Sequence, residues 1–404
     1  MSRSVVIVGG GVAGLEALMA CRDLAGERAE LTLVAPGPDF LYKPLLVEEP
    51  FDLGPAERHE LAPLAAELGA RFVPRAVRSV RKDEHTIALD DGSALAYDFL
   101  IVCVGGRFRP ALEGVRTFPS GGEPLRINEL LASGEDQVRV AFVVPPGVTW
   151  ALPIYEIALM SQRRALELGR DARLVIVTPE EAPLAIFGHA ASAGVRELLA
   201  ARGIAFEGSS SVRERNGDEL VVSPRDRRIA ANEVLALPVM EGPAIKGLPT
   251  DEEGFIPIDE HAQVRGVEDV YAAGDGTSFP IKQGGLGTQQ ADAAAAHLAH
   301  RLGAAVEVEP FRPVLRGKLL TGDESLHLRA DVAGGAGEGG AALDCLWWPP
   351  HKISGRYLAP FLYYGEVHTE PEPPRHPLEV EVELPKEWHA EPMALDPYRS
   401  PEIE

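Results

Sequence analysis

The chain has 404 residues, of which 45% are apolar and 25% charged, the composition of a soluble globular protein with two or three domains. Its formal net charge of −22 argues against nucleic acid as a partner, because a phosphate-binding surface must be basic. No apolar run approaches the roughly 20 residues that span a bilayer. The cysteines Cys21, Cys103 and Cys345 form no disulfide or metal pattern, and the N-terminal sequence leaves no room for a cleavable signal. We therefore expect a cytoplasmic protein that binds no metal.

The first informative stretch, residues 4–24, reads SVVIVGGGVAGLEALMACRDL. It predicts a buried parallel strand, then a turn that contains Gly9, Gly11 and Gly14, then a helix rich in alanine and leucine. The glycines of such a GxGxxG turn allow a tight bend, a close approach to a pyrophosphate and close packing of the helix on the strand. A second strand, ELTLVA (30–35), follows at the expected distance. The stretch therefore predicts a dinucleotide site.

The second strand departs from this pattern at its end. An aspartate or glutamate usually stands there and holds a ribose hydroxyl, whereas this chain has Ala35. Asp39, four residues later, is the candidate to replace it.

Two later stretches identify the dinucleotide. YDFLIVCVGG (97–106) and VEDVYAAGDGTSFP (267–280) resemble the two short FAD signatures of the pyridine nucleotide-disulfide oxidoreductase superfamily. The resemblance implies that Asp275 contacts the ribityl and pyrophosphate part of FAD, although Cys103 and Val104 replace the usual Ala-Thr of the first signature. We expect FAD to contact Gly9, Gly11, Val12, Ala13, Gly14, Ala35, Lys43, Val77, Val104, Gly105, Gly274, Asp275, Gln283 and Gly284.

Strands that alternate with helices predict an α/β fold with two Rossmann-like, three-layer nucleotide-binding domains and a small α+β C-terminal domain. The expected limits are 1–112 and 247–305 for a discontinuous FAD domain, 113–246 for a second nucleotide-binding-like domain, 306–365 for a C-terminal interface domain, and 366–404 for an acidic tail rich in Pro and Glu. Residues 312–330 predict a strand pair, and HPLEVEVELP (376–385) predicts an edge strand within the tail.

The second nucleotide-binding unit lacks its phosphate loop. PPGVTW (145–150) stands where a GxGxxG turn belongs, and Pro145 and Pro146 remove N–H donors that a phosphate needs. Glu180 and Glu181, at the end of the next strand, are candidates for a ribose contact. We expect that NAD(P)H does not bind here in the usual manner, and a working NAD(P)H site with a non-standard loop stays the alternative.

The chain also lacks the CxxxxC of disulfide reductases, and FLYKPLL (40–46) instead resembles type II NADH:quinone dehydrogenases and, more distantly, sulfide:quinone oxidoreductases without their paired cysteines. This resemblance places Trp150 beside the flavin and makes Glu156 of YEIAL a candidate proton-handling group. The alternative is an ordinary glutamate in the first helical turn. Lys282 would stabilise negative charge at flavin N1/O2. Gln289 and Gln290 would border a quinone pocket or be surface or core residues, and Cys345 is a reactive thiol only as the less favoured alternative.

A C-terminal stretch (346–364) is unusually aromatic for a chain with 6% aromatic residues. Tyr357, Leu358, Phe361 and Leu362 fit one helical face. This face is a candidate for a homodimer interface, a quinone entrance or peripheral contact with the inner face of the membrane, and core packing is the alternative.

These observations together predict an FAD-dependent oxidoreductase that passes electrons between an unidentified small-molecule donor and an acceptor such as a quinone. Two alternatives stay open. One is an NAD(P)H:acceptor oxidoreductase with a non-standard nucleotide loop, and the other is a non-enzymatic FAD-binding redox sensor or structural protein.

Overall fold

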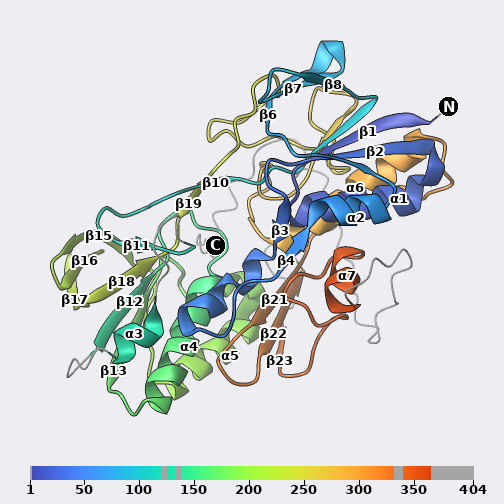
Figure 1. Cartoon of the computed structure of the whole chain (residues 1–404). Coiled ribbons are helices and arrows are strands. Elements are labelled where there is room, and N and C mark those ends of the chain that lie inside the picture. The colour runs from blue at the N-terminus through green and yellow to red at the C-terminus, as the bar shows by residue number, and fades with distance from the viewer. Residues whose placement is uncertain (1, 120–125, 133–137, 332–339, 365–404) are drawn as a thin grey trace, which may run out of the picture.

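The computed structural model describes residues 2–119, 126–132, 138–331 and 340–364. Two parallel sheets of five strands lie at opposite ends of an elongated molecule, and a smaller antiparallel sheet lies beside α7 (Leu358–Tyr364) (Figure 1). The predicted α/β class is confirmed. The domain limits given above stay a prediction, and the predicted edge strand at 376–385 lies outside the described residues.

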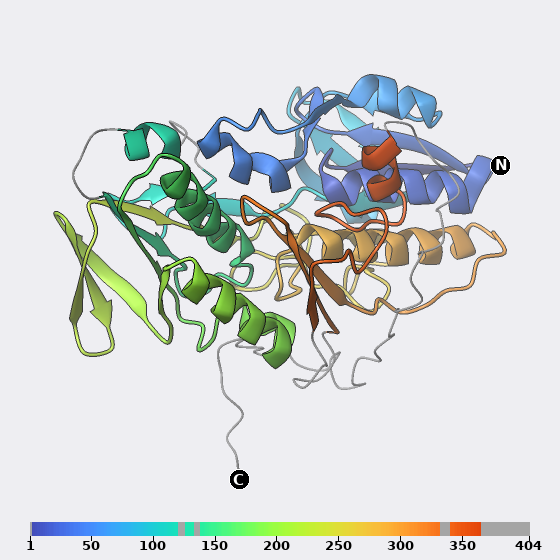
Figure 2. The same ribbon diagram turned by 90° about the horizontal axis from the view of Figure 1, so that it is seen from below.

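The first sheet holds the N-terminal strand at its centre. Its strands, in spatial order, are β20 (Val270–Ala272), β9 (Phe99–Val102), β1 (Arg3–Val8), β2 (Ala29–Val34) and β5 (Arg71–Val73). Val5, Val6 and Ile7 are fully buried, as expected for a parallel strand covered on both faces. The helices α1 (Val12–Ala25) and α6 (Gly284–Arg301) pack side by side along this sheet (Figure 2).

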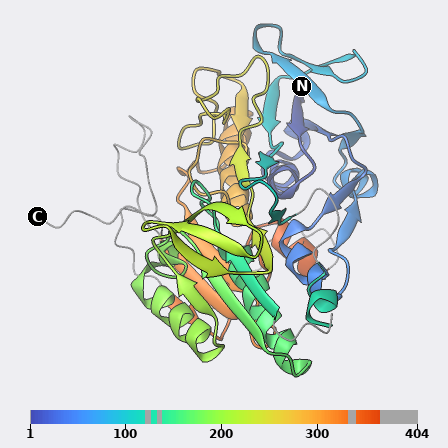
Figure 3. The same ribbon diagram turned by 90° about the vertical axis from the view of Figure 1, so that its left-hand side faces the viewer.

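The second sheet contains the predicted strand–helix–strand unit of residues 138–178, which is confirmed. Its strands, in spatial order, are β11 (Arg116–Thr117), β18 (Glu233–Ala236), β12 (Val138–Val143), β13 (Ala172–Val177) and β14 (Ala205–Glu207). The helices that accompany it are α3 (Ile127–Ala132), α4 (Leu152–Glu167) and α5 (Gly188–Ala201). On the opposite face, a separate apolar cluster joins Val143 and Val177 to the antiparallel strands β15 (Ser211–Asn216), β16 (Glu219–Ser223) and β17 (Arg227–Ala230), which lie in front in Figure 3.

Shorter elements connect these layers. The short strands are β3 (Asp39–Leu41), β4 (Arg58–Glu60), β6 (Val77–Arg81), β7 (Thr86–Leu89), β8 (Ala94–Ala96), β10 (Arg107–Arg109) and β19 (Val239–Glu241). The short helices are α2 (Leu61–Glu67) and the 3₁₀ segments Gly26–Arg28, Lys43–Phe51, Lys82–Glu84 and Ala185–Phe187. The antiparallel pair of β10 and β19 joins the two halves of the chain.

The C-terminal part begins with the predicted strand pair, which is confirmed. It consists of β21 (Val314–Leu319), β22 (Leu326–Asp331), β23 (Gly340–Ala342) and α7 (Leu358–Tyr364). Each helix within the described ranges is too short or too polar to cross a bilayer.

α7 is held against the first sheet by a buried carboxylate of α1. Glu16 is fully buried and accepts hydrogen bonds from the N–H groups of Tyr357 (2.9 Å) and Leu358 (2.7 Å). Tyr357, Leu358 and Phe361 belong to the core of the first sheet, so core packing is the role that the structure gives to this helical face. Tyr363 and Tyr364 stay about 40% exposed.

This carboxylate makes stability depend on pH. Burial raises the pKa of Glu16 to about 7, although the hydrogen bonds from the start of α7 oppose the shift. The folded carboxyl therefore keeps a proton that the unfolded chain loses near pH 4.5, and stability falls as pH rises through this window, by up to about 1.4 kcal/mol per pH unit for one proton.

Glu16→Gln should reduce this dependence between pH 5 and 7, because glutamine releases no proton on unfolding and only the buried Asp292 beside it, whose pKa burial also raises, then titrates. Urea denaturation across the pH range measures the slope of the free energy of unfolding. Glu27→Gln, at an exposed glutamate just beyond α1, is the control and should keep the wild-type slope. An unchanged slope in Glu16→Gln would remove this residue from the pH dependence.

Candidate active site

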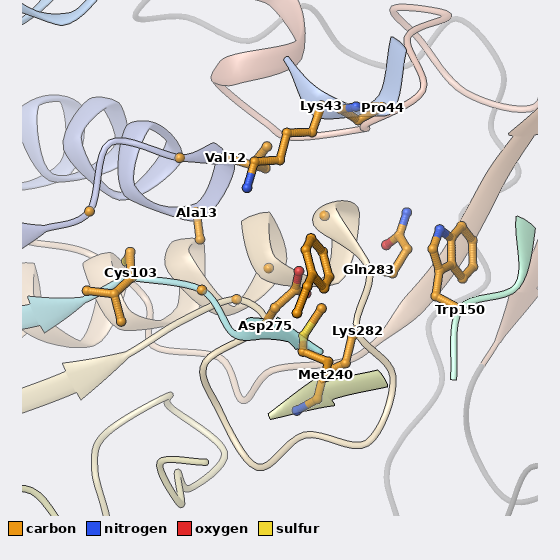
Figure 4. A pocket seen from close by; sticks show the side chains of 18 of the residues that line it. Val12, Ala13, Lys43, Pro44, Cys103, Trp150, Met240, Asp275, Lys282 and Gln283 are labelled. Carbon is orange, nitrogen blue, oxygen red and sulfur yellow. The ribbon is translucent and has the colours of Figure 1, made fainter. Parts of the chain in front are cut away.

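One cavity of about 1050 Å³ collects the loops that follow the carboxyl ends of both parallel sheets. From the first sheet it receives the loops after β1, β2, β9 and β20, and from the second sheet the loops after β12 and β18. Such edges are where α/β folds bind ligands. Figure 4 shows Cys103 toward one end of this pocket, Trp150 toward the other, and Asp275 and Gln283 between them.

The glycine turn brings the start of α1 to the cavity. A Cβ at Gly9, whose φ is +114°, would lie 2.1 Å from the carbonyl oxygen of Cys103, and one at Gly14 would lie 1.8 Å from the carbonyl oxygen of Gly9. Gly11 differs, because no atom lies within 4 Å of its Cβ position. Two of the glycines thus allow close packing, and the third borders open space beside the helix end.

This open space fits a phosphate. α1 begins after Gly11 without a capping side chain, and the first N–H groups of a helix have no partner within it. They carry the positive end of the helix dipole and lie on the cavity wall with Val12 and Ala13. The residues present therefore fit the diphosphate of a dinucleotide.

The structure brings the predicted residues together, with one difference. Thirteen of the fourteen predicted cofactor contacts line the cavity: Gly9, Gly11, Val12, Ala13, Ala35, Lys43, Val77, Val104, Gly105, Gly274, Asp275, Gln283 and Gly284. Gly14 does not line it and instead permits the close approach of α1 to the glycine turn. The predicted Trp150, Glu156 and Lys282 also line the cavity, as does Asp39.

Asp275 and Lys282 form a partly buried pair of charges. Burial raises the pKa of Asp275, and Lys282 and Lys43 oppose that shift. Burial lowers the pKa of Lys282 to about 8. The Lys282 ammonium donates to the carbonyl oxygen of Thr277 (2.5 Å) and lies 3.6 Å from the centre of the Phe255 ring, so part of its charge is already satisfied by the protein.

Glu156 is paired with a lysine that the sequence did not reveal. Its carboxylate is fully buried, and Lys352 Nζ lies 2.7 Å from Oε2. Lys352 also donates to the carbonyl oxygen of Pro44 (2.9 Å), and the N–H of Leu320 donates to Glu156 Oε1 (2.9 Å). Burial raises the pKa of Glu156, while Lys352 opposes the shift. Glu156 is therefore half of a buried ion pair on the cavity wall. The alternative of an ordinary first-turn glutamate is wrong, because α4 has no acidic residue in its first turn.

Other candidates lie outside the cavity. Gln290 accepts a hydrogen bond from the N–H of Gly274 (2.7 Å), and Gln289 bonds both backbone groups of Val314, so the two glutamines brace α6. Glu180 is buried against Tyr155. Cys345 donates to the carbonyl oxygen of Trp347, and burial raises the pKa of its thiol.

These features define a dinucleotide-binding α/β protein with a buried ion pair in its ligand cavity. The chain matches the pyridine nucleotide-disulphide oxidoreductase family over residues 3–297 and belongs to that family. The protein is therefore an oxidoreductase, and its family binds FAD, NAD(P) or both.

Three known proteins are similar to this chain. It is 28% identical over 336 residues to the ferredoxin reductase component of chlorobenzene dioxygenase from a Cupriavidus species, with 76% of this chain and 77% of that protein covered. It is 24% identical over 297 residues to a demethylphylloquinone reductase from a Synechocystis species, with 67% and 71% covered. The sulfide:quinone oxidoreductase of Aquifex aeolicus has the same fold, with a TM-score of 0.75, 19% identity, and 85% and 87% of the two chains covered.

We expect substitution of the closely packed Gly14 to lower stability and substitution of Gly11, which borders open space, to weaken cofactor binding. Gly14→Ala should lower the free energy of unfolding of the cofactor-free protein by about 1–3 kcal/mol, because the new Cβ overlaps a backbone oxygen. Gly11→Ala, at a φ of −96°, should leave that stability unchanged and weaken dinucleotide binding instead. Urea denaturation and cofactor titration separate the two effects. Equal behaviour of the two variants would contradict this division of roles.

Because Glu156 and Lys352 form a buried ion pair, we expect a large difference in the free energy of unfolding between the single and the double variant. Lys352→Met should lower the free energy of unfolding by about 3–5 kcal/mol at pH 7, because it leaves the buried Glu156 carboxylate without its partner. The double variant Lys352→Met with Glu156→Gln should recover most of this loss, since no unpaired charge stays buried. Urea denaturation measures all three proteins. Lys352→Met with wild-type stability would show that the two groups are not coupled.

Proposed function

We propose that the protein is an FAD-dependent oxidoreductase that passes electrons from a small-molecule donor to a quinone-type acceptor. The observation that carries this proposal is the buried ion pair of Glu156 and Lys352 on the wall of the cavity that also contains the glycine turn. Quinone reduction needs two protons as well as two electrons, and this pair is a source of protons that is shielded from water.

The residues of the first sheet are suited to hold FAD. The start of α1 would bind its diphosphate, Asp275 its ribityl chain, and the wall at Ala35 and Asp39 its ribose. When bound, FAD would supply reversible transfer of two electrons. The cavity volume of about 1050 Å³ lies at the upper end of the range of about 300–1000 Å³ for small-molecule sites, which leaves room for a substrate beside a cofactor.

Glu156 and Lys352 would act on the acceptor. In the ion pair the transferable proton lies on the Lys352 ammonium, and Glu156, whose pKa burial raises, would take up that proton and pass it to an oxygen that gains negative charge. Lys352 Nζ, 2.7 Å from this carboxylate, would orient it and donate a hydrogen bond to the acceptor carbonyl. Lys282 would offset negative charge that develops near Asp275. Trp150, whose ring lies 5.8 Å from that of Phe187, would form an apolar wall for the acceptor ring.

The relatives support this choice of acceptor, because one reduces demethylphylloquinone and the fold neighbour is a sulfide:quinone oxidoreductase. We place the protein in the cytoplasm, with the exposed Tyr363 and Tyr364 of α7 as the region that would meet the inner face of the membrane, where apolar quinones dissolve.

Glu156→Gln should slow quinone reduction about 10²–10⁴-fold, the usual contribution of a general acid. The protein is reduced with dithionite, which needs no knowledge of the natural donor, and then mixed without oxygen with 2-methyl-1,4-naphthoquinone while the flavin band is followed by stopped flow.

Glu180→Gln is the matched control, since Glu180 is an equally buried glutamate outside the cavity, and it should keep the wild-type rate. Reoxidation of Glu156→Gln at the wild-type rate from pH 5 to 9 would exclude Glu156 as the proton donor.

A further inference from the structure

The carboxyl end of the second parallel sheet is where a second dinucleotide would bind in this fold. The loops after β12 and β18 reach the cavity there, through Gly147, Val148, Leu237 and Pro238. A dinucleotide at this edge needs N–H donors for its diphosphate and an acidic side chain for its ribose. Both requirements can be checked against the contacts of this chain.

Several of the N–H donors that a diphosphate would need are missing or engaged within the loop. Pro145 and Pro146 have no N–H, and the N–H of Val148 donates to the carbonyl oxygen of Pro145 (3.3 Å). The hydroxyl oxygen of Thr149 accepts from the N–H of Lys282 (3.2 Å). α4 has Pro153 in its first turn, which removes a further donor from the helix end. The carboxyl edge of the second sheet therefore has no turn lined by N–H donors like the one at Gly11.

The ribose acceptor is also engaged. Glu180, just after β13, is only 3% exposed and does not line the cavity. Its carboxylate accepts hydrogen bonds from the hydroxyls of Tyr155 (2.6 Å) and Thr178 (3.0 Å). Because the carboxylate is buried, a ribose could reach it only if the side chains around it moved. The sequence hypothesis that Glu180 contacts a ribose is therefore not supported by its position.

Apolar side chains take the place of these polar groups. Phe108 and Met240 face each other across the pair of β10 and β19, and both line the cavity with Val148 and Leu237. Phe108 is 48% exposed, so part of its ring surface is open to a ligand.

We propose that this apolar wall, formed by Phe108, Val148, Leu237 and Met240, is the binding site for an uncharged apolar ring compound, in the place where relatives of this fold would hold a nicotinamide dinucleotide. The inference rests on the proposed function because it takes the same cavity as the redox site. The inference adds the chemical class of the ligand that binds at the edge of the second sheet. Phe108 would stack on the ring of that ligand, an arrangement that aromatic pairs favour.

The test measures binding without electron transfer, using the FAD-loaded full chain and two redox-inactive probes in calorimetric titrations. 2-Naphthol stands for an uncharged ring, and ADP-ribose carries the diphosphate and ribose of a dinucleotide. We expect 2-naphthol to bind and ADP-ribose to give no binding up to about 1 mM, which would correspond to a binding free energy weaker than about −4 kcal/mol.

Phe108→Ala should weaken 2-naphthol binding about tenfold, because the stacked ring is lost. Leu166→Ala is the matched control, since Leu166 is 57% exposed on α4 and lies outside the cavity, and it should bind as the wild type does. Binding of ADP-ribose, no binding of 2-naphthol, or equal 2-naphthol affinity in Phe108→Ala and wild type would each overturn the proposal.

This result is distinguishable from failure of the proposed function. Quinone reoxidation that depends on Glu156 would still support the oxidoreductase proposal if ADP-ribose bound. Conversely, 2-naphthol binding that depends on Phe108 would still support the apolar site if Glu156→Gln left reoxidation unchanged.

Discussion

The close contact between the glycine turn and the strands around it is the constraint on which the rest of the site depends. α1 can begin at the carboxyl edge of the first sheet only because Gly9 and Gly14 carry no side chain where the backbone of Cys103 and of the turn itself lies. This contact aims the N–H groups of the helix start at the cavity. Asp275 then meets this helix end from β20, which pairs with β9 although some 170 residues separate them in the chain. A larger side chain at either glycine would displace the helix from the position that makes a phosphate site.

A second contact closes the other side of the cavity. The segment that contains Lys352 and Ile353 crosses from the C-terminal strands to the first sheet, where the N–H of Ile353 donates to the hydroxyl oxygen of Tyr42 (3.0 Å) and Glu16 receives the start of α7. These bonds bring Lys352 to Glu156 of α4, on the second sheet. The cavity thus has a wall suited to phosphates, a wall with the buried ion pair of Glu156 and Lys352, and an apolar wall at Phe108 and Met240. The three walls come from different parts of the chain and differ in their chemistry.

The sequence predicted those parts of the site that short patterns determine. The glycine turn and the strands and helix of residues 138–178 follow from local spacing and periodicity. The Gly274–Asp275 turn was predicted from its resemblance to a short family signature. The sequence did not predict the role of Lys352, because Lys352 lies 196 residues from Glu156 in an irregular segment. Only the tertiary fold determines which residues are its neighbours. Phe108 and Met240 lie in strands of three residues, too short for any alternation to show. Gln289 and Gln290 were assigned by loose resemblance, and their hydrogen bonds to the backbone could not be read from the sequence.

We propose that the first glycine turn binds FAD and that the corresponding edge of the second sheet does not bind a dinucleotide. A crystal structure of the protein grown with both FAD and NADH tests it most directly. We expect this crystal structure to contain FAD with its diphosphate at the start of α1 and no nicotinamide nucleotide at residues 145–150. A nucleotide diphosphate bound at Pro145–Gly147, or a cavity at Gly9–Gly14 that stays empty in excess FAD, would contradict it.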